Sequence, residues 1–230
     1  MFSTSIVACL AALLAVSAAP ASRSECSTAG DTLNLPGSTS ALPAPPAGDP
    51  SFIALGVGVQ NYTCGATGTY TSTGAVAELF NLACADESAF NIITDVVSAA
   101  WQAAPASFTP QELISDLAVF HPAIVLGQHY FIANPTGGLS PKWDFTSASL
   151  AGHPDAFVVG ARTGDVPAPT NPAVNVDWLS LKNASGDLAT AIYRVQTRGG
   201  QPPTSCTLGT PDISVRYVSQ YWFYGGSFAG

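Results

Sequence analysis

Apolar and polar residues alternate along most of this chain, and the alternation predicts strands. β-Branched and aromatic residues stand between turns rich in Gly and Pro, which is typical of antiparallel β structure. In residues 188–197, for example, Tyr193 and Val195 face one way and Ile192 and Arg194 the other. The predicted strands cover 52–64, a hairpin or short strand within 68–77, a segment beginning at Glu78, 124–132, 156–161, 174–181, 188–197 and 213–223.

One region, between residues 86 and 119, has the period of a helix instead. Large apolar residues recur there at spacings of three and four, at Phe90, Ile93, Val97 and Trp101. Thr109 and Pro110 then provide a cap and a first-turn proline, which predicts a second helix over 110–119. The fold class that follows is mainly β, an antiparallel β-sandwich or barrel with a two-helix insertion at about 88–119.

The amino terminus predicts export from the cell. Residues 6–16 are an unbroken apolar run, which is shorter than the roughly 20 residues that span a bilayer. Small residues follow this run, as signal peptidase requires, so we predict a signal peptide over 1–18 or up to 21. Residues 22–50 are rich in Pro and Ser and predict an extended arm, and residues 51–230 predict a single β-rich domain.

Composition narrows the classes of protein. Charged residues make up 10% of the chain, and Asp and Glu outnumber Lys and Arg by 15 to 7. This balance argues against nucleic acid as a partner, because phosphates require clustered cations. After the leader, no segment is apolar and long enough to predict a membrane span, so the expected location is extracellular. The sequence predicts no cofactor and leaves the oligomeric state open.

Cysteines and glycosylation sequons agree with an oxidising compartment. Four cysteines remain after the predicted leader, and an even number predicts two disulfides with three pairings open. Two sequons for N-glycosylation begin at Asn61 and Asn183. Asn183 lies in a polar segment that predicts a turn and is the better acceptor, whereas Asn61 stands within a predicted strand.

Several stretches of the chain resemble one family. They include LGVGVQNYTC at 55–64, PKWDF at 141–145, YRVQTRGGQPP at 193–203 and ISVRYVSQYWFYG at 213–225. The chain thereby resembles DUF3455, secreted fungal and bacterial proteins of unknown function, from about residue 40 to its end. The resemblance implies a Cys64–Cys206 disulfide, which leaves Cys26 to pair with Cys84.

Some fungal members of that family are labelled malate dehydrogenase, an activity that the residues do not support. Residues 56–61 give G-x-G-x-x-N, which lacks the third Gly of a dinucleotide fingerprint and continues as a strand. The chain also lacks the alternating strands and helices that build a parallel sheet. A serine-hydrolase elbow and the spacings of zinc ligands are absent as well, so no metal site is predicted.

His129, within GQHYF, is the first candidate for catalytic chemistry. Asp144 follows within cross-strand distance and Glu78 precedes it, so the three side chains are candidates for an acid/base arrangement. The competing interpretation is a hydrogen-bonded histidine on a sheet, with Asp144 closing a turn. On the first interpretation the protein is a small extracellular hydrolase that uses His129 with an acidic partner.

The final strand supplies candidates for binding. Trp222 and Tyr224 share one face with Arg216 and Gln220, and Trp143 adds a further aromatic ring. Exposed rings on a sheet stack on sugars, whereas the competing interpretation is ordinary core, in which aromatic residues supply buried area. The function favoured by the sequence is a non-catalytic extracellular or cell-wall-associated binding protein for polysaccharide, because no catalytic arrangement is complete.

Overall fold

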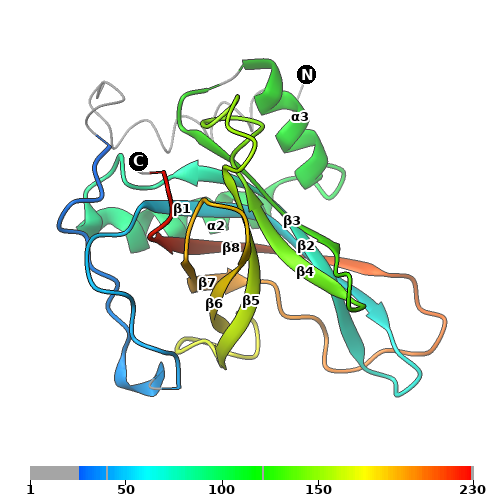
Figure 1. Ribbon diagram of the computed structural model, residues 1–230. Coiled ribbons are helices and arrows are strands. Elements are labelled where there is room, and N and C mark those ends of the chain that lie inside the picture. The colour runs from blue at the N-terminus through cyan, green and yellow to red at the C-terminus, as the bar shows by residue number, and fades with distance from the viewer. Residues whose placement is uncertain (1–25, 40, 121, 229–230) are drawn as a thin grey trace.

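The computed structural model describes residues 26–39, 41–120 and 122–228 (Figure 1). The described chain forms a closed barrel in which each strand pairs antiparallel with the next and β8 closes on β1. The eight strands of this part of the chain are β1 (Phe52–Cys64), β2 (Tyr70–Asn81), β3 (Val125–Ala133), β4 (Leu139–Asp144), β5 (Phe157–Val166), β6 (Trp178–Ser185), β7 (Ala191–Gly199) and β8 (Ile213–Tyr224). The predicted antiparallel fold is confirmed, as a barrel and not a sandwich. The predicted signal peptide lies outside the described residues.

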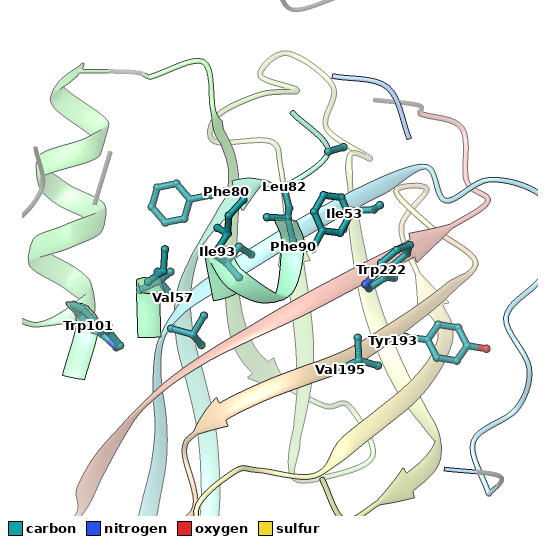
Figure 2. Packing of buried hydrophobic residues seen from close by; sticks show 14 of the residues in the cluster. Ile53, Val57, Phe80, Leu82, Phe90, Ile93, Trp101, Tyr193, Val195 and Trp222 are labelled. Carbon is teal, nitrogen blue, oxygen red and sulfur yellow. The ribbon is translucent and has the colours of Figure 1, made fainter. Parts of the chain in front are cut away.

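Side chains that alternate along the strands form an inner and an outer apolar cluster. On β8, Tyr217 and Tyr221 belong to the inner cluster, while Val218 and Trp222 belong to the outer one. Figure 2 shows the outer cluster, where side chains from the strands meet those of the helices. Strand β8 is therefore covered on both faces along its second half.

Helix α2 (Phe90–Ala103), which follows the short 3-10 helix η3 (Glu87–Ala89), packs on the outer face of β8 and β7. Its buried stripe confirms the predicted period, because Phe90, Val97 and Trp101 are all buried. The rings of Phe90 and Trp222 meet edge to face with centroids 6.1 Å apart. Trp101 Nε1 donates a hydrogen bond of 2.7 Å to the carbonyl of Gly58 and so ties the end of α2 to β1.

Helix α3 (Pro110–Phe120) begins where the sequence predicts. The Thr109 amide donates to Glu112 Oε2 at 2.8 Å, and the Glu112 amide donates to Thr109 Oγ1 at 3.2 Å, which is a reciprocal capping box. Leu113 and Leu117 are buried on the side that faces the barrel. The helix packs mainly on the outer face of β2 and also contacts β1 (Figure 1).

In the described residues of the arm before β1, 26–39 and 41–51, the short 3-10 helix η2 (Gly37–Thr39) is the only regular element. Leu33 and Leu42 are buried against the barrel, and a disulfide joins Cys26 to Cys84. A second disulfide joins Cys64, at the end of β1, to Cys206 in the loop before β8. These two pairings are the ones that the family resemblance implies.

Three local predictions are wrong, and one of them is the turn at Asn183, which lies within β6. Residues 70–81 form one strand, β2, with an irregular register at which Asn61 lies opposite Gly74 and Tyr62 opposite Ser72. Gly74 has a φ of +119° and marks a bulge within the strand, where the sequence predicts a hairpin or short strand separate from the segment that begins at Glu78. Strand β4 is missed altogether, because Pro141 stands inside it and prolines are typical of turns.

Arg216 of β8 closes the carboxyl end of α2. Its Nη1 donates to the carbonyls of Trp101 at 2.8 Å and Ala104 at 2.6 Å. Its Nη2 donates to the carbonyls of Pro105 at 2.6 Å and Phe108 at 3.0 Å. The guanidinium also lies 4.8 Å from the centroid of the Trp101 ring.

We expect R216K to lower the free energy of unfolding by about 2 kcal/mol, because lysine has no planar fork that reaches several carbonyls at once. Denaturant unfolding measures the change. The matched control is R162K, in an exposed ion pair with Asp165, which should change stability by less than about 0.5 kcal/mol. Equal losses in the two variants would contradict a special role for Arg216.

Candidate ligand pocket

Three polar side chains form a row across the outer face of β2, β3 and β4. The strand register places Glu78 opposite Gln128, and Gln128 opposite Asp144. Residues directly opposite one another in a sheet project to the same side, so the three side chains share the outer face. His129, the next residue along β3, projects to the other side and into the barrel.

A pocket of about 140 Å³ lies between this sheet face and helix α3. Glu78 and Gln128 supply polar groups from the sheet. Most of the other lining residues are aliphatic, among them Ile114, Leu117, Ala118, Val125 and Ala148, whereas Ser147 is polar, so the pocket surface is mixed in character. A cavity of roughly 150 Å³ holds one benzene molecule, so this pocket fits a ligand of about six to eight non-hydrogen atoms.

Glu78 is the most unusual group in the pocket. The residue is 3% exposed, and its Oε2 has no hydrogen-bond partner among the described residues. Burial raises the pKa of Glu78 to about 8, so its carboxyl is mostly neutral at pH 7. An unpartnered buried polar atom costs about 1–3 kcal/mol. Buried polar groups that lower the stability of the fold in this way are typical of functional sites.

Asp144 lies on the same face, but both of its carboxylate oxygens have partners. Its Oδ2 lies 2.7 Å from Lys142 Nζ and accepts a hydrogen bond of 2.7 Å from the Tyr130 hydroxyl. Its Oδ1 accepts a bond of 3.0 Å from the Thr146 amide. Burial alone raises the pKa of Asp144, but the bonds from Lys142, Thr146 and Tyr130 outweigh burial and lower it to about 2. Asp144 is therefore an ionised carboxylate held within the sheet.

His129 is 2% exposed and lies inside the barrel. Its ring stacks on Trp143 with centroids 4.5 Å apart, and its Nδ1 makes a hydrogen bond of 2.9 Å with the Lys142 carbonyl. Burial lowers the pKa of His129 to about 3, which keeps the ring neutral. The structure thus brings Glu78 and Asp144 to one face of the sheet and does not bring His129 to them.

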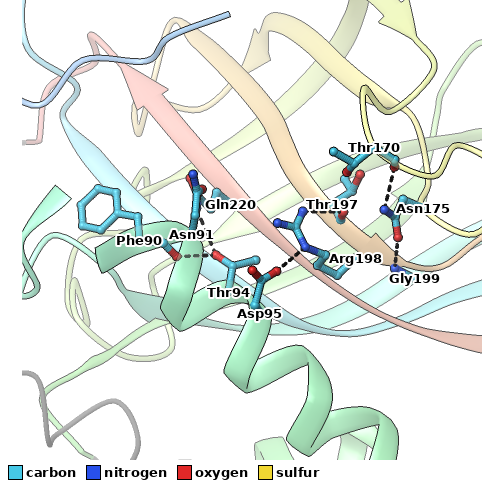
Figure 3. Close-up of polar contacts among 10 residues, drawn as sticks. All are labelled: Phe90, Asn91, Thr94, Asp95, Thr170, Asn175, Thr197, Arg198, Gly199 and Gln220. Atoms are coloured by element: carbon cyan, nitrogen blue, oxygen red, sulfur yellow. Dashed lines mark hydrogen bonds and ion pairs between the residues drawn. The ribbon is translucent and has the colours of Figure 1, made fainter. Parts of the chain in front are cut away.

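The aromatic candidates of the final strand are also covered. Trp222 and Tyr224 are each 3% exposed, in the outer cluster beneath α2 and the arm. Gln220 Nε2 donates to Asn91 Oδ1 at 3.2 Å and Thr94 Oγ1 at 3.0 Å (Figure 3). With Arg216 bound to the carbonyls at the end of α2 and Trp143 inside the barrel, these residues form no open groove.

The two sequons occupy different surroundings. Asn183 lies within β6, and its Nδ2 donates to the carbonyls of Gly186 and Ala189, both at 2.7 Å. Asn61 lies within β1 and uses its Oδ1, which accepts a bond of 2.8 Å from the Ser214 hydroxyl. The Nδ2 atom, which receives the glycan, therefore already donates two hydrogen bonds at Asn183, the sequon that the sequence favours.

Sequence reasoning named Glu78 but missed the rest of its pocket. Ile114 and Leu117 come from α3, and Val125 and Gln128 from β3, so only tertiary folding assembles them. One signal was available in the sequence: Glu78 is a single acid within the apolar run AVAELF, and a carboxyl in such a run marks a buried position.

Fold and pocket together define a class: a closed antiparallel barrel with a ligand-sized pocket on its outer surface, under a helical insertion. The chain belongs to a family described as protein of unknown function (DUF3455), whose model matches residues 45–225. No curated protein and no solved structure matches the chain. Among the described side chains, no group of three or more His, Cys, Asp or Glu is placed to hold a metal ion. None of the described helices has the length and apolar character needed to cross a membrane.

Replacing Glu78 with Gln tests the neutral state of its carboxyl. The unfolded chain loses this proton near the ordinary pKa of 4.5, whereas the folded chain keeps it up to about pH 8. Native stability therefore falls as pH rises between these two values. We expect E78Q to be more stable than the parent, by a margin that grows from pH 5 to pH 8 by up to about 1.4 kcal/mol per pH unit.

Urea unfolding at several pH values measures this margin. The control is E112Q, which changes an exposed acid of α3 and keeps the capping box, so its pH dependence should follow that of the parent. A constant difference between E78Q and the parent across this range would show that Glu78 is already ionised in the fold.

Proposed function

We propose that this protein is a secreted, non-catalytic binding protein that holds a small, partly apolar molecule in the pocket at Glu78. The observation that supports the proposal most is a buried carboxyl with an unpartnered oxygen, lining a pocket of about 140 Å³. A ligand with one polar head group supplies the missing hydrogen-bond partner. Its hydrocarbon part covers aliphatic walls such as Leu117 and Val125, as in most small-molecule sites.

The same geometry gives less support to hydrolysis. His129 is enclosed in the barrel, where its Nδ1 is bonded to a backbone carbonyl. Asp144 is bonded to Lys142, Tyr130 and Thr146. An acid/base pair must reach the same reacting atom within about 3 Å, and these two side chains lie on opposite faces of a sheet.

Polysaccharide as the partner has less support than a small molecule. The aromatic rings that suggested it, Trp222 and Tyr224, are beneath α2 and the arm. The walls of the Glu78 pocket are mostly aliphatic and offer no aromatic platform for a sugar ring. A pocket of this size admits a molecule smaller than an oligosaccharide.

The size of the pocket bounds the affinity. Very small ligands gain roughly 0.6–1.2 kcal/mol of binding free energy per non-hydrogen atom, which is below the ceiling for such ligands. A ligand of about seven such atoms therefore has a dissociation constant between about 1 mM and 1 μM. Ligand-observed NMR with a library of fragments in this size range is suited to such affinities. We expect several fragments to bind to the parent protein.

The variant A148F places a ring in the pocket and should abolish binding of these fragments. The matched control is A151F, three residues further along the same loop at an exposed position outside the pocket, which should leave binding unchanged. The circular dichroism spectra of both variants should match that of the parent. Fragments that bind equally to both variants, or a library without binders, would contradict the proposed pocket.

Secretion is the second part of the proposal and is tested separately. It is supported by the predicted leader and by two disulfides, which persist in oxidising compartments. Expression with the native leader in a secreting host should deliver the chain to the medium, cleaved after Ala18 or Ala21. Mass spectrometry of the secreted protein reads the new amino terminus and locates glycans at Asn61 or Asn183. A chain retained in the cell with its leader intact would contradict secretion.

A further inference from the structure

The groups around the pocket favour a positively charged ligand. A buried carboxylate normally has a cation beside it. The salt bridges among the described residues are those of Asp144, Asp165 and Asp95, and none includes Glu78. The fold therefore contains a carboxyl whose ionised form lacks its usual partner.

The carboxyl end of α3 also favours a positively charged ligand. The pocket is lined by Leu117 and Ala118 of the last turn of this helix and by Pro122 just after it. Carbonyls at the carboxyl end of a helix have no partner within it and carry partial negative charge, which attracts cations. The last turn of α3 contains no basic residue.

The charged side chains of α3, β3 and β4 do not reverse this preference for a cation. Helix α3 carries Glu112 and Asp116, and β4 carries Lys142 and Asp144, whose opposite charges are paired at 2.7 Å. His129 of β3 lies inside the barrel. The whole chain has a formal net charge of −8, which attracts cations and repels anions.

We propose that the ligand is a small aliphatic amine, whose ammonium group donates to the Glu78 carboxylate and whose hydrocarbon part packs against Ile114, Leu117 and Val125. The Gln128 side-chain oxygen, beside Glu78 in the register, is a second acceptor for the ammonium group. This inference rests on the proposed function and names its ligand class.

Binding of the amine is coupled to release of a proton. In the free protein the Glu78 carboxyl keeps its proton at pH 7, because burial raises its pKa to about 8. The ammonium ion pairs only with the carboxylate, so one proton leaves Glu78 for solvent as one ammonium ion enters. The apparent dissociation constant then equals the intrinsic one divided by the ionised fraction.

The test uses isothermal titration calorimetry with three probes of similar shape: 3-methylbutylamine, 3-methylbutanol and 3-methylbutanoic acid. At pH 8 the amine should bind at least tenfold more tightly than the alcohol or the acid. Its affinity should rise by about tenfold from pH 6 to pH 7 and about fivefold from pH 7 to pH 8, and should then level off, because the ionised fraction of Glu78 changes in this way. Titrations at pH 6 in buffers of different ionisation enthalpy should show release of about one proton.

Three variants separate Glu78 from other groups. E78Q should lose the preference for the amine and the pH dependence while it still binds the alcohol. E112Q removes a nearby exposed charge and should behave as the parent does. His121 precedes Pro122 in the sequence and lies outside the described residues, and H121A should also keep the pH dependence.

The outcomes distinguish this inference from the proposed function. If the alcohol or the acid binds as tightly as the amine at pH 8, or E78Q keeps the preference for the amine, the amine inference is overturned while the pocket stands. If none of the three probes binds but other fragments do, the amine inference is again overturned. If no probe or fragment binds at all, the proposed function fails together with it.

Discussion

Closure of the barrel by the pairing of β8 with β1 is the contact on which the rest of the structure depends. Strand β8 brings large side chains to both faces, and β1 makes room for them. A Cβ atom at Gly56 would lie 2.6 Å from the Tyr221 ring, so a side chain at this position would displace that ring from the barrel interior. The outer face of β8 needs a cover of its own, which α2 provides where its Phe90 packs against Trp222 of β8.

The position of the pocket follows from how α2 is held. Trp101 bonds to β1, and Arg216 of β8 binds the carbonyls after the helix, so the end of α2 is fixed on the closing pair of strands. The chain then enters α3, which packs mainly on the outer face of β2. Helix α3 covers Glu78 without providing a partner for its Oε2, and the space left between helix and sheet is the pocket.

Glu78 and Asp144 show how surroundings decide the state of a carboxyl. Glu78 projects from β2 and Asp144 from β4 on the same face of the sheet, with Gln128 of β3 between them. Asp144 gains bonds from Lys142, Tyr130 and Thr146 that outweigh its burial, and its pKa is lowered. Glu78 gains no such bonds, and burial raises its pKa. One carboxyl therefore stabilises the sheet, while the other retains an oxygen that has no hydrogen-bond partner among the described residues.

The sequence by itself determined the antiparallel β class, the helical period over residues 90–101, the capped start of α3 and the even set of cysteines, because periodicity and caps act between near neighbours in the chain. It divided β2, whose bulge lies at Gly74, into two segments, and it missed β4, because glycine and proline within a strand are also typical of turns. It named His129, Asp144 and Glu78 together, but their faces depend on strand register. Register, barrel closure and the approach of α3 to β2 are contacts between distant segments, and only the tertiary structure decided them.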